Sequence, residues 1–184
     1  MVYLALLRGI NVGGHNIIRM TDLKRCFEDA GFEDVLTYIQ SGNVVFTAEN
    51  TERQALASRI ETILSGRFNY DSKVVVISRA QLAYAVSHAP EDFGTRQDAF
   101  KYDVIFLRPP LRPGEVMKQI PLGDGVDRAY AGKDVVYVSR VTARVAQSRL
   151  SRIVGLPIYR ELTIRNWNTT TKLLELMKRR EAGG

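Results

Sequence analysis

The stretch DVLTYIQSGNVVFT, residues 34–47, decides the fold that the sequence predicts. Its two ends, residues 34–39 and 44–47, are rich in the β-branched and aromatic residues that favour strands. Between them, QSGN has the serine, glycine and asparagine chemistry of a tight turn. The stretch is therefore expected to form a β-hairpin.

A strand and a helix are predicted before this hairpin. VYLALL, residues 2–7, is a short apolar run typical of a buried strand. Apolar residues at helical spacing then run from an expected N-cap at Thr21 to an expected C-terminal cap at Gly31.

A helix and a strand are predicted after it. Thr51 and Gln54 match a capping box at the start of a helix that reaches about Gly66, and KVVVI, residues 73–77, is a second buried run. The order β-α-β-β-α-β predicts the split βαβ, ferredoxin-like arrangement, in which two helices cover one face of a four-stranded antiparallel sheet.

The second half of the chain begins to repeat this order. Strands are predicted over residues 102–107, 128–131 and 135–139, and helices after a capping box of Ser78 with Gln81, from Pro113, over residues 145–154 and over residues 163–180. The last helix is expected to pack on the body, with Trp167 in the core. The predicted fold class is α+β, with two ferredoxin-like halves: a subdomain over residues 1–80 and a second over residues 81–184 that ends in a basic helical region.

The charge of the chain is concentrated near its C-terminus. The formal net charge is +6, and residues 140–184 carry 10 Lys and Arg against 3 Asp and Glu. Such an excess attracts phosphates, nucleic acid or other anions, although basic surfaces also serve only to keep a protein dissolved.

Composition argues against several other classes of function. With Cys26 as the only cysteine and His15 and His88 as the only histidines, no disulfide, metal site or cofactor is expected. No segment approaches the roughly 18 apolar residues of a membrane span. A cytoplasmic protein with no membrane partner is therefore expected.

The first polar segment, RGINVGGHN (residues 8–16), follows the first predicted strand. Its glycines match neither the phosphate-binding G-x-x-x-x-G-K-[ST] pattern nor G-x-G-x-x-G. The candidate ligand-binding residues in it are Arg8, Asn11, Gly13, Gly14, His15 and Asn16. The alternative is that these residues only make local turn hydrogen bonds.

Two further polar segments add candidates. In the hairpin turn these are Gln40, Ser41 and Asn43, whose ordinary role is to form the turn. In SRLSRIVGLPIYRELTIRNWNTTTK (residues 148–172), cations are interleaved with aromatic and amide side chains, as on phosphate-binding or nucleic-acid-binding surfaces. The candidates there are Arg165, Asn166, Asn168 and Lys172.

Three segments together resemble a known family. LLRGINVGGHN, YIQSGNVVF and TIRNWNTTTKL are similar to signature segments of the bacterial proteins grouped as domain of unknown function 1697. That resemblance implies a two-subdomain α+β fold with ferredoxin-like halves, and it implies no activity. Ile164 departs from the family, whose members more often carry a threonine there.

These observations favour a domain that binds an anionic ligand, either a phosphate-bearing small molecule or nucleic acid, at a polar corner formed by the three segments. One alternative is an enzyme acting on a phosphorylated or nucleotide substrate, with His15 as the acid or base. Another is a protein-interaction module without a ligand.

Overall fold

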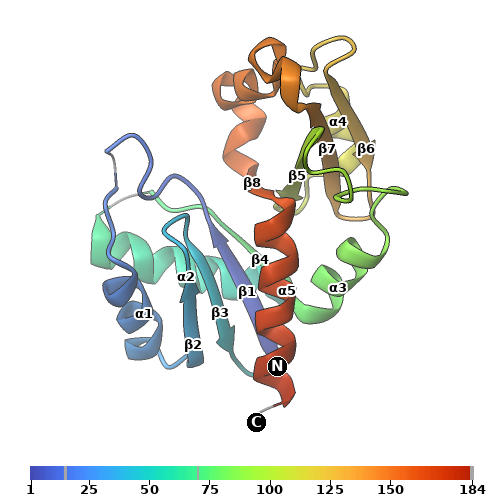
Figure 1. The fold of residues 1–184 in the computed structure, drawn as a ribbon. Helices are drawn as coiled ribbons and strands as arrows, with labels where there is room; N and C mark the ends of the chain where they lie inside the picture. The colour runs from blue at the N-terminus through green and yellow to red at the C-terminus, as the bar shows by residue number, and fades with distance from the viewer. Residues whose placement is uncertain (15, 70, 183–184) are drawn as a thin grey trace. The chain divides into compact units, whose positions relative to one another are not determined.

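The computed structural model describes residues 1–14, 16–69 and 71–182, which form two compact units. Unit 1 comprises Met1–Leu82 and the C-terminal segment from Leu173, and unit 2 comprises Ala83–Lys172 (Figure 1). The division falls inside helix α3 (Arg79–Ser87). The predicted α+β class, with two four-stranded antiparallel sheets and a C-terminal helix, is confirmed.

Unit 1 has the predicted order of elements, and its sheet has the strand order β2-β3-β1-β4 with antiparallel neighbours. The elements are β1 (Val2–Leu7), α1 (Met20–Asp29), β2 (Glu33–Tyr38), β3 (Asn43–Thr47), α2 (Arg53–Phe68) and β4 (Val74–Ser78). The hairpin of β2 and β3 forms as predicted, with Tyr38 opposite Asn43 at its turn.

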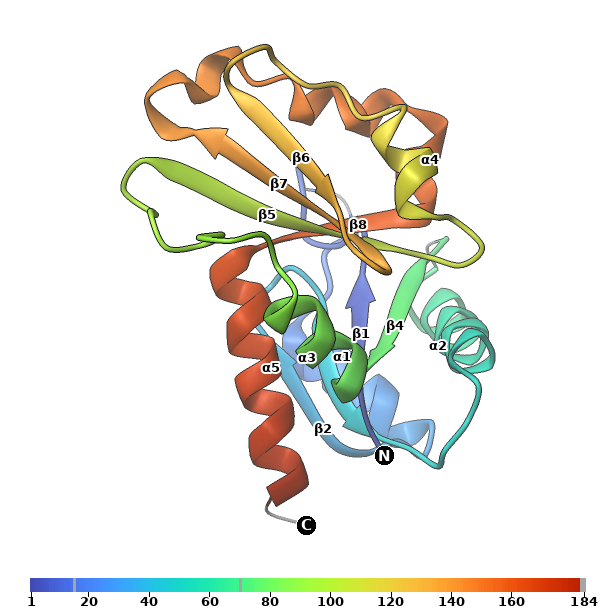
Figure 2. The ribbon, with the colours of Figure 1, turned by 90° about the vertical axis from the view of Figure 1, so that its right-hand side faces the viewer.

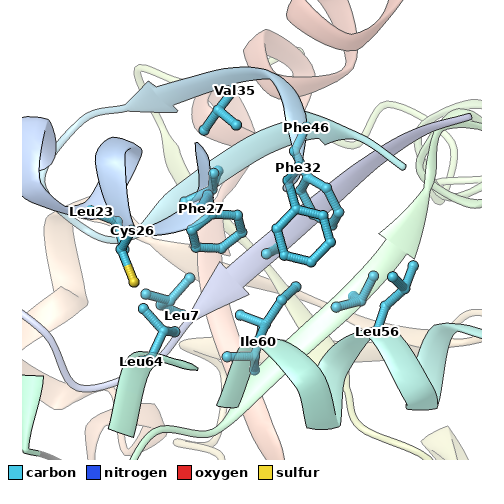
Figure 3. Packing of buried hydrophobic residues seen from close by; sticks show 14 of the residues in the cluster. Leu7, Leu23, Cys26, Phe27, Phe32, Val35, Phe46, Leu56, Ile60 and Leu64 are labelled. Atoms are coloured by element: carbon cyan, nitrogen blue, oxygen red, sulfur yellow. The ribbon is translucent and has the colours of Figure 1, made fainter. Parts of the chain in front are cut away.

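The core of unit 1 lies between its sheet and helices α1 and α2. Phe27, Phe32 and Phe46 pack their rings against one another there, with centroids 4.8–5.6 Å apart (Figure 3). Leu56 and Ile60 come from α2 on the opposite side of the cluster. Since a fully buried side chain of this size contributes about 2–3 kcal/mol, this cluster is a major source of stability.

The single cysteine belongs to the same core. Cys26 is buried on α1, and burial raises the pKa of its thiol above the ordinary 9.0. A thiol that stays protonated is a poor nucleophile, so Cys26 has a packing role.

The C-terminal helix α5 (Trp167–Ala182) is tied to unit 1 near its end. Arg79 pairs with Glu181 at 2.6 Å, and Arg180 pairs with Asp34 at 3.8 Å. Leu173, Leu174 and Met177 are buried, so one face of this helix is apolar, as the spacing of its apolar residues predicts.

Unit 2 contains a second sheet, with the order β6-β7-β5-β8 and antiparallel neighbours (Figure 2). Its elements are β5 (Phe100–Leu107), α4 (Pro113–Met117), β6 (Asp127–Ala131), β7 (Val135–Val141), the 3₁₀ segments η1 (Thr142–Gln147), η2 (Leu150–Gly155) and η3 (Pro157–Glu161), and β8 (Leu162–Asn166). The order of strands along the chain and across the sheet repeats that of unit 1. Tyr137 donates a 2.6 Å hydrogen bond to the carbonyl of Ala85, which joins the end of α3 to this sheet.

The helix predicted over residues 145–154 is wrong: the chain forms separate 3₁₀ turns there. The N–H of Arg149, which an α-helix would direct at a carbonyl one turn earlier, donates instead to Oδ2 of Asp127 at 2.9 Å. That long-range bond interrupts the ladder, and the sequence pattern could not show it.

The last helix begins later than predicted. Residues 162–166 form β8 instead, since Thr163 and Ile164 are β-branched and pair with β5. Asn166 then caps α5, because its Oδ1 accepts from the N–H of Thr169 at 2.8 Å. Trp167 is half-buried, so its predicted place in the core is only partly correct.

Two of the predicted N-caps are also wrong. Arg19, whose side chain makes no capping hydrogen bond, precedes α1, so Thr21 lies inside the helix. Glu52 rather than Thr51 caps α2 by accepting from the N–H of Ala55 at 2.9 Å. The capping box of Ser78 with Gln81 is confirmed by reciprocal bonds of 3.0 and 3.3 Å.

Candidate functional site

The first polar segment and the hairpin turn meet in unit 1, through the side chain of Asn11. Its Nδ2 donates to the carbonyls of Ile18 at 3.0 Å and Gln40 at 2.9 Å, and its Oδ1 accepts from the N–H of Ile18 at 2.8 Å. Asn11 has a φ of +53°, which asparagine tolerates better than most residues. It therefore holds the loop closed and attaches it to the turn.

Other amides of these two segments are also used locally. Asn16 donates to the carbonyl of Gly9 at 2.9 Å. Asn43 is fully buried and donates to the carbonyl of Tyr38 at 2.9 Å and to Oγ of Ser41 at 3.0 Å. The local alternative thus accounts for these hydrogen bonds of Asn16 and Asn43.

The remaining candidates of unit 1 differ in exposure. Arg8 is half-buried directly after β1, whereas Gln40 is exposed at the turn. Gly13 and Gly14 are exposed and have φ values of +60° and +77°. His15, the candidate acid or base, lies outside the described residues.

The third polar segment belongs to unit 2, and its candidate residues differ in exposure. Arg165 is buried on β8 and donates to Oγ1 of Thr163 at 2.8 Å and to the carbonyl of Ile164 at 2.9 Å. Burial lowers its pKa to about 10, so it remains a cation at neutral pH. Lys172 is half-buried on α5, whereas Asn166 and Asn168 are exposed at its start.

A cavity of about 350 Å³ lies beside these two asparagines, and we call it the edge pocket. Its volume suits a small ligand. It is lined by Gln97, Phe100, Lys101, Tyr102, Asp103, Arg140, Asn166, Trp167 and Asn168, all of unit 2.

The register of the strands explains why the cavity forms there. Pairing between β5 and β8 ends where Asp103 faces Asn166, after which the chain turns into α5. Residues 100–102 of β5 pair with β7 on their other side, and the described residues place no strand opposite them on the β8 side. The early end of β8 thus leaves an open edge.

Polar residues reach this edge from the face that is apolar elsewhere in the sheet. Lys101 and Asp103 alternate along β5 with the same period as the buried Ile105 and Leu107. Arg140 lies directly across from Lys101 on β7. The cationic side chains therefore meet at the polar end of an apolar face.

The electrostatics of the pocket centre on one ion pair. Arg140 Nη2 lies 2.5 Å from Asp103 Oδ2, and Asp103 is buried. Burial raises the pKa of Asp103 above the ordinary 3.8, although Arg140 acts in the opposite direction. With Lys101 as a second cation, the ionised lining carries a net positive charge.

Replacing Asp103 with asparagine is expected to change how stability depends on pH. Because its pKa is raised, the folded chain holds this proton to higher pH than the unfolded chain does. The contribution of Asp103 to stability is therefore fully present below pH 3.8 and is lost as pH rises through the folded pKa. The variant lacks this loss, so its stability relative to wild type should increase over that window.

Urea unfolding of both proteins at a series of pH values from mildly acidic to neutral measures this difference. A difference that stays constant would mean that Arg140 balances burial at Asp103, and a relative stability of the variant that falls as pH rises would mean that Arg140 outweighs burial.

The sequence identified Asn166 and Asn168 but missed the rest of the pocket. A signal was present at Asp103, since a carboxylate inside the apolar strand predicted over residues 102–107 is exceptional. The partner Arg140 could be found only from the strand register.

The edge pocket presents mainly amide, aromatic and cationic side chains. Its described lining residues include no histidine, cysteine or serine, and its one carboxylate is paired with Arg140. Among the described residues, no three His, Cys, Asp or Glu side chains gather in a way that could hold a metal ion. Nor does any helix in this part of the chain have the length and apolarity needed to cross a bilayer.

Comparison with known proteins supports the fold. The conserved bacterial protein SP0830 from Streptococcus pneumoniae is similar to this chain, with 25% identity and a TM-score of 0.81 over 96% of this chain and 98% of that protein. No curated protein matches the chain.

A family of uncharacterised proteins matches residues 1–137. This range contains the first two polar segments and ends before the third. The resemblance noted from the sequence is thereby confirmed, and the chain belongs to the family described as Protein of unknown function (DUF1697).

Proposed function

We propose that this protein binds a small phosphate-bearing ligand in the edge pocket of unit 2. The observation that carries the proposal is the cavity of about 350 Å³ in which Lys101, Arg140 and Trp167 all take part. Two cations facing one carboxylate leave an excess of positive charge for an anion. The amide of Asn166 adds a directional donor to the same lining.

The two cations of the pocket, Arg140 and Lys101, differ in how far their side chains are held in place. Arg140 is positioned by Asp103, so its guanidinium loses little conformational entropy when it binds a phosphate. Lys101 is exposed and is free to close on the same anion. Such charge-assisted hydrogen bonds are the strong ones in phosphate recognition.

The scaffold proposed for this site is ferredoxin-like in both units, since each sheet interleaves two crossovers in the same strand order. We place the protein in the cytoplasm, where its single buried thiol would stay reduced.

Nucleic acid is a larger candidate ligand that carries the same phosphate groups. The excess of 10 cations over 3 acids in residues 140–184 favours a phosphate backbone as a partner. A pocket of this volume holds one nucleotide unit at a time, so the small ligand is the simpler occupant.

Replacing Lys101 with alanine is expected to weaken binding of ribose 5-phosphate about tenfold, the value of one charge-assisted contact. Trp167 is the only tryptophan in the chain and lines the pocket, so its fluorescence reports occupancy. Titrations at low and high salt should show weaker binding as salt rises.

Lys118 provides the matched control, because it is an exposed lysine of unit 2 outside the pocket. Lys118→Ala removes the same charge and should leave the affinity within about twofold of wild type. Equal losses of affinity in the two variants would mean that Lys101 acts only through the overall charge of the protein. Failure of wild type to bind at low salt would end the proposal.

The loops of unit 1 that carry the first two polar segments are the second place where this anion could bind. The half-buried Arg8, the exposed Gln40 and the joined loops around Asn11 support it. Arg8→Ala is the corresponding variant, and a loss of affinity there with none in Lys101→Ala would move the site to unit 1.

A further inference from the structure

We infer that the ligand of the edge pocket carries an adenine base, which Asn168 recognises; this inference rests on the proposed function. The starting point is a chain of amides at the rim of the pocket. Gln97 Nε2 donates to the carbonyl of Gly94 at 3.1 Å, and Asn168 Nδ2 donates to Oε1 of Gln97 at 2.9 Å.

The carbonyl of Gly94 fixes the direction of this chain. A carbonyl only accepts, so it holds the NH₂ group of Gln97 and turns the oxygen of that amide towards Asn168. That oxygen in turn holds the NH₂ group of Asn168. The orientation of the Asn168 amide is therefore set before any ligand arrives.

The oriented amide keeps one acceptor and one donor for a ligand. Within the described residues, Oδ1 of Asn168 accepts no hydrogen bond, and its Nδ2 has a second N–H beyond the one given to Gln97. An amide with this pair matches adenine, whose N6 donates and whose N7 accepts. Guanine presents acceptors at both O6 and N7, so Oδ1 would face an oxygen.

The same glycine also positions the aromatic side chain of the pocket. A Cβ on Gly94 would lie closer than 3.0 Å to three atoms of the Trp167 ring, so only glycine lets the ring lie against this backbone. Trp167 packs edge-on with Phe93, at a centroid distance of 5.1 Å, and remains half-buried at the pocket. Aromatic rings of this kind bind bases by stacking.

The two ends of a nucleotide, its phosphate and its base, are assigned to different parts of the pocket lining. Lys101 and Arg140 hold the phosphate in the proposed function, while Trp167 and Asn168 take the base in the same cavity. A mononucleotide therefore uses both the cationic and the amide part of the lining, whereas free phosphate uses only the first.

The test compares adenosine monophosphate, guanosine monophosphate and ribose 5-phosphate by quenching of Trp167 fluorescence. Adenosine monophosphate is expected to bind about tenfold tighter than guanosine monophosphate, as one bidentate amide contact would give. In Asn168→Ala the preference should disappear while the affinity for ribose 5-phosphate is retained. Alanine suits the first turn of α5, so folding is not at risk.

Gln97→Ala separates positioning from contact. It frees the Asn168 amide to rotate, so the preference should fall although Asn168 is still present. Equal affinities of wild type for the two nucleotides, or a preference that survives in Asn168→Ala, would overturn the adenine assignment and leave phosphate binding standing. If ribose 5-phosphate and both nucleotides fail to bind, the proposed function itself is overturned.

Discussion

Replacing Gly42 with alanine is expected to lower the free energy of unfolding by about 3 kcal/mol, the combined cost of a left-handed alanine and an overpacked contact. Gly42 has a φ of +78°, and an added Cβ would lie 2.8 Å from both the Cβ of Leu7 and the Cδ1 of Ile10. Its carbonyl also accepts from the N–H of Leu7 at 2.8 Å. The turn therefore cannot move away without breaking the end of β1.

Gly66→Ala is the matched control in the same unit. Gly66 lies inside α2 with open space around an added Cβ, so the variant should be unchanged or up to about 1 kcal/mol more stable. Urea unfolding followed by circular dichroism measures both. A Gly42→Ala protein as stable as wild type would contradict the close packing of the hairpin turn on the first loop.

A Gly94→Ala variant is expected to displace Trp167 and to lose about 3 kcal/mol or more of stability, for the same two reasons. Its φ is +87°, and the added methyl group would overlap the Trp167 ring. The ring must then leave Phe93 and the pocket lining. Tryptophan emission should shift to longer wavelength, and quenching by ribose 5-phosphate should be lost.

Gly114→Ala controls for a glycine replacement in unit 2. An added Cβ there meets nothing within 4 Å, so emission and stability should match those of wild type. If Gly94→Ala kept the wild-type emission maximum and unfolding midpoint, the close packing of Trp167 against Gly94 would be contradicted.

The hairpin and the alternation of strands and helices in unit 1 were predictable because local patterns determine them. QSGN forms the turn and the apolar runs form strands, and the resemblance pointed to the same fold. The second half was harder, because its conformation depends on contacts between distant residues. Asp127 captures the N–H of Arg149, and pairing with β5 makes a strand of residues that were predicted to begin a helix.

The candidate site was also hard to predict, because it too depends on contacts between distant residues. Polar residues mark a segment without showing whether they bind a ligand or the protein's own backbone. Asn11 and Asn43 donate to backbone carbonyls of unit 1. Conversely, Lys101 and Arg140 are 39 positions apart in a chain where many lysines and arginines are spread along the surface, and only the sheet register pairs them.

The most direct test of the edge pocket is an NMR titration of isotope-labelled protein with ribose 5-phosphate. The single indole N–H signal, that of Trp167, and the backbone amides of Lys101, Arg140 and Asn168 are predicted to shift together and to saturate with one affinity. Shifts confined to the loops around Asn11 and Gln40, or no shifts at low salt, would contradict binding in the edge pocket.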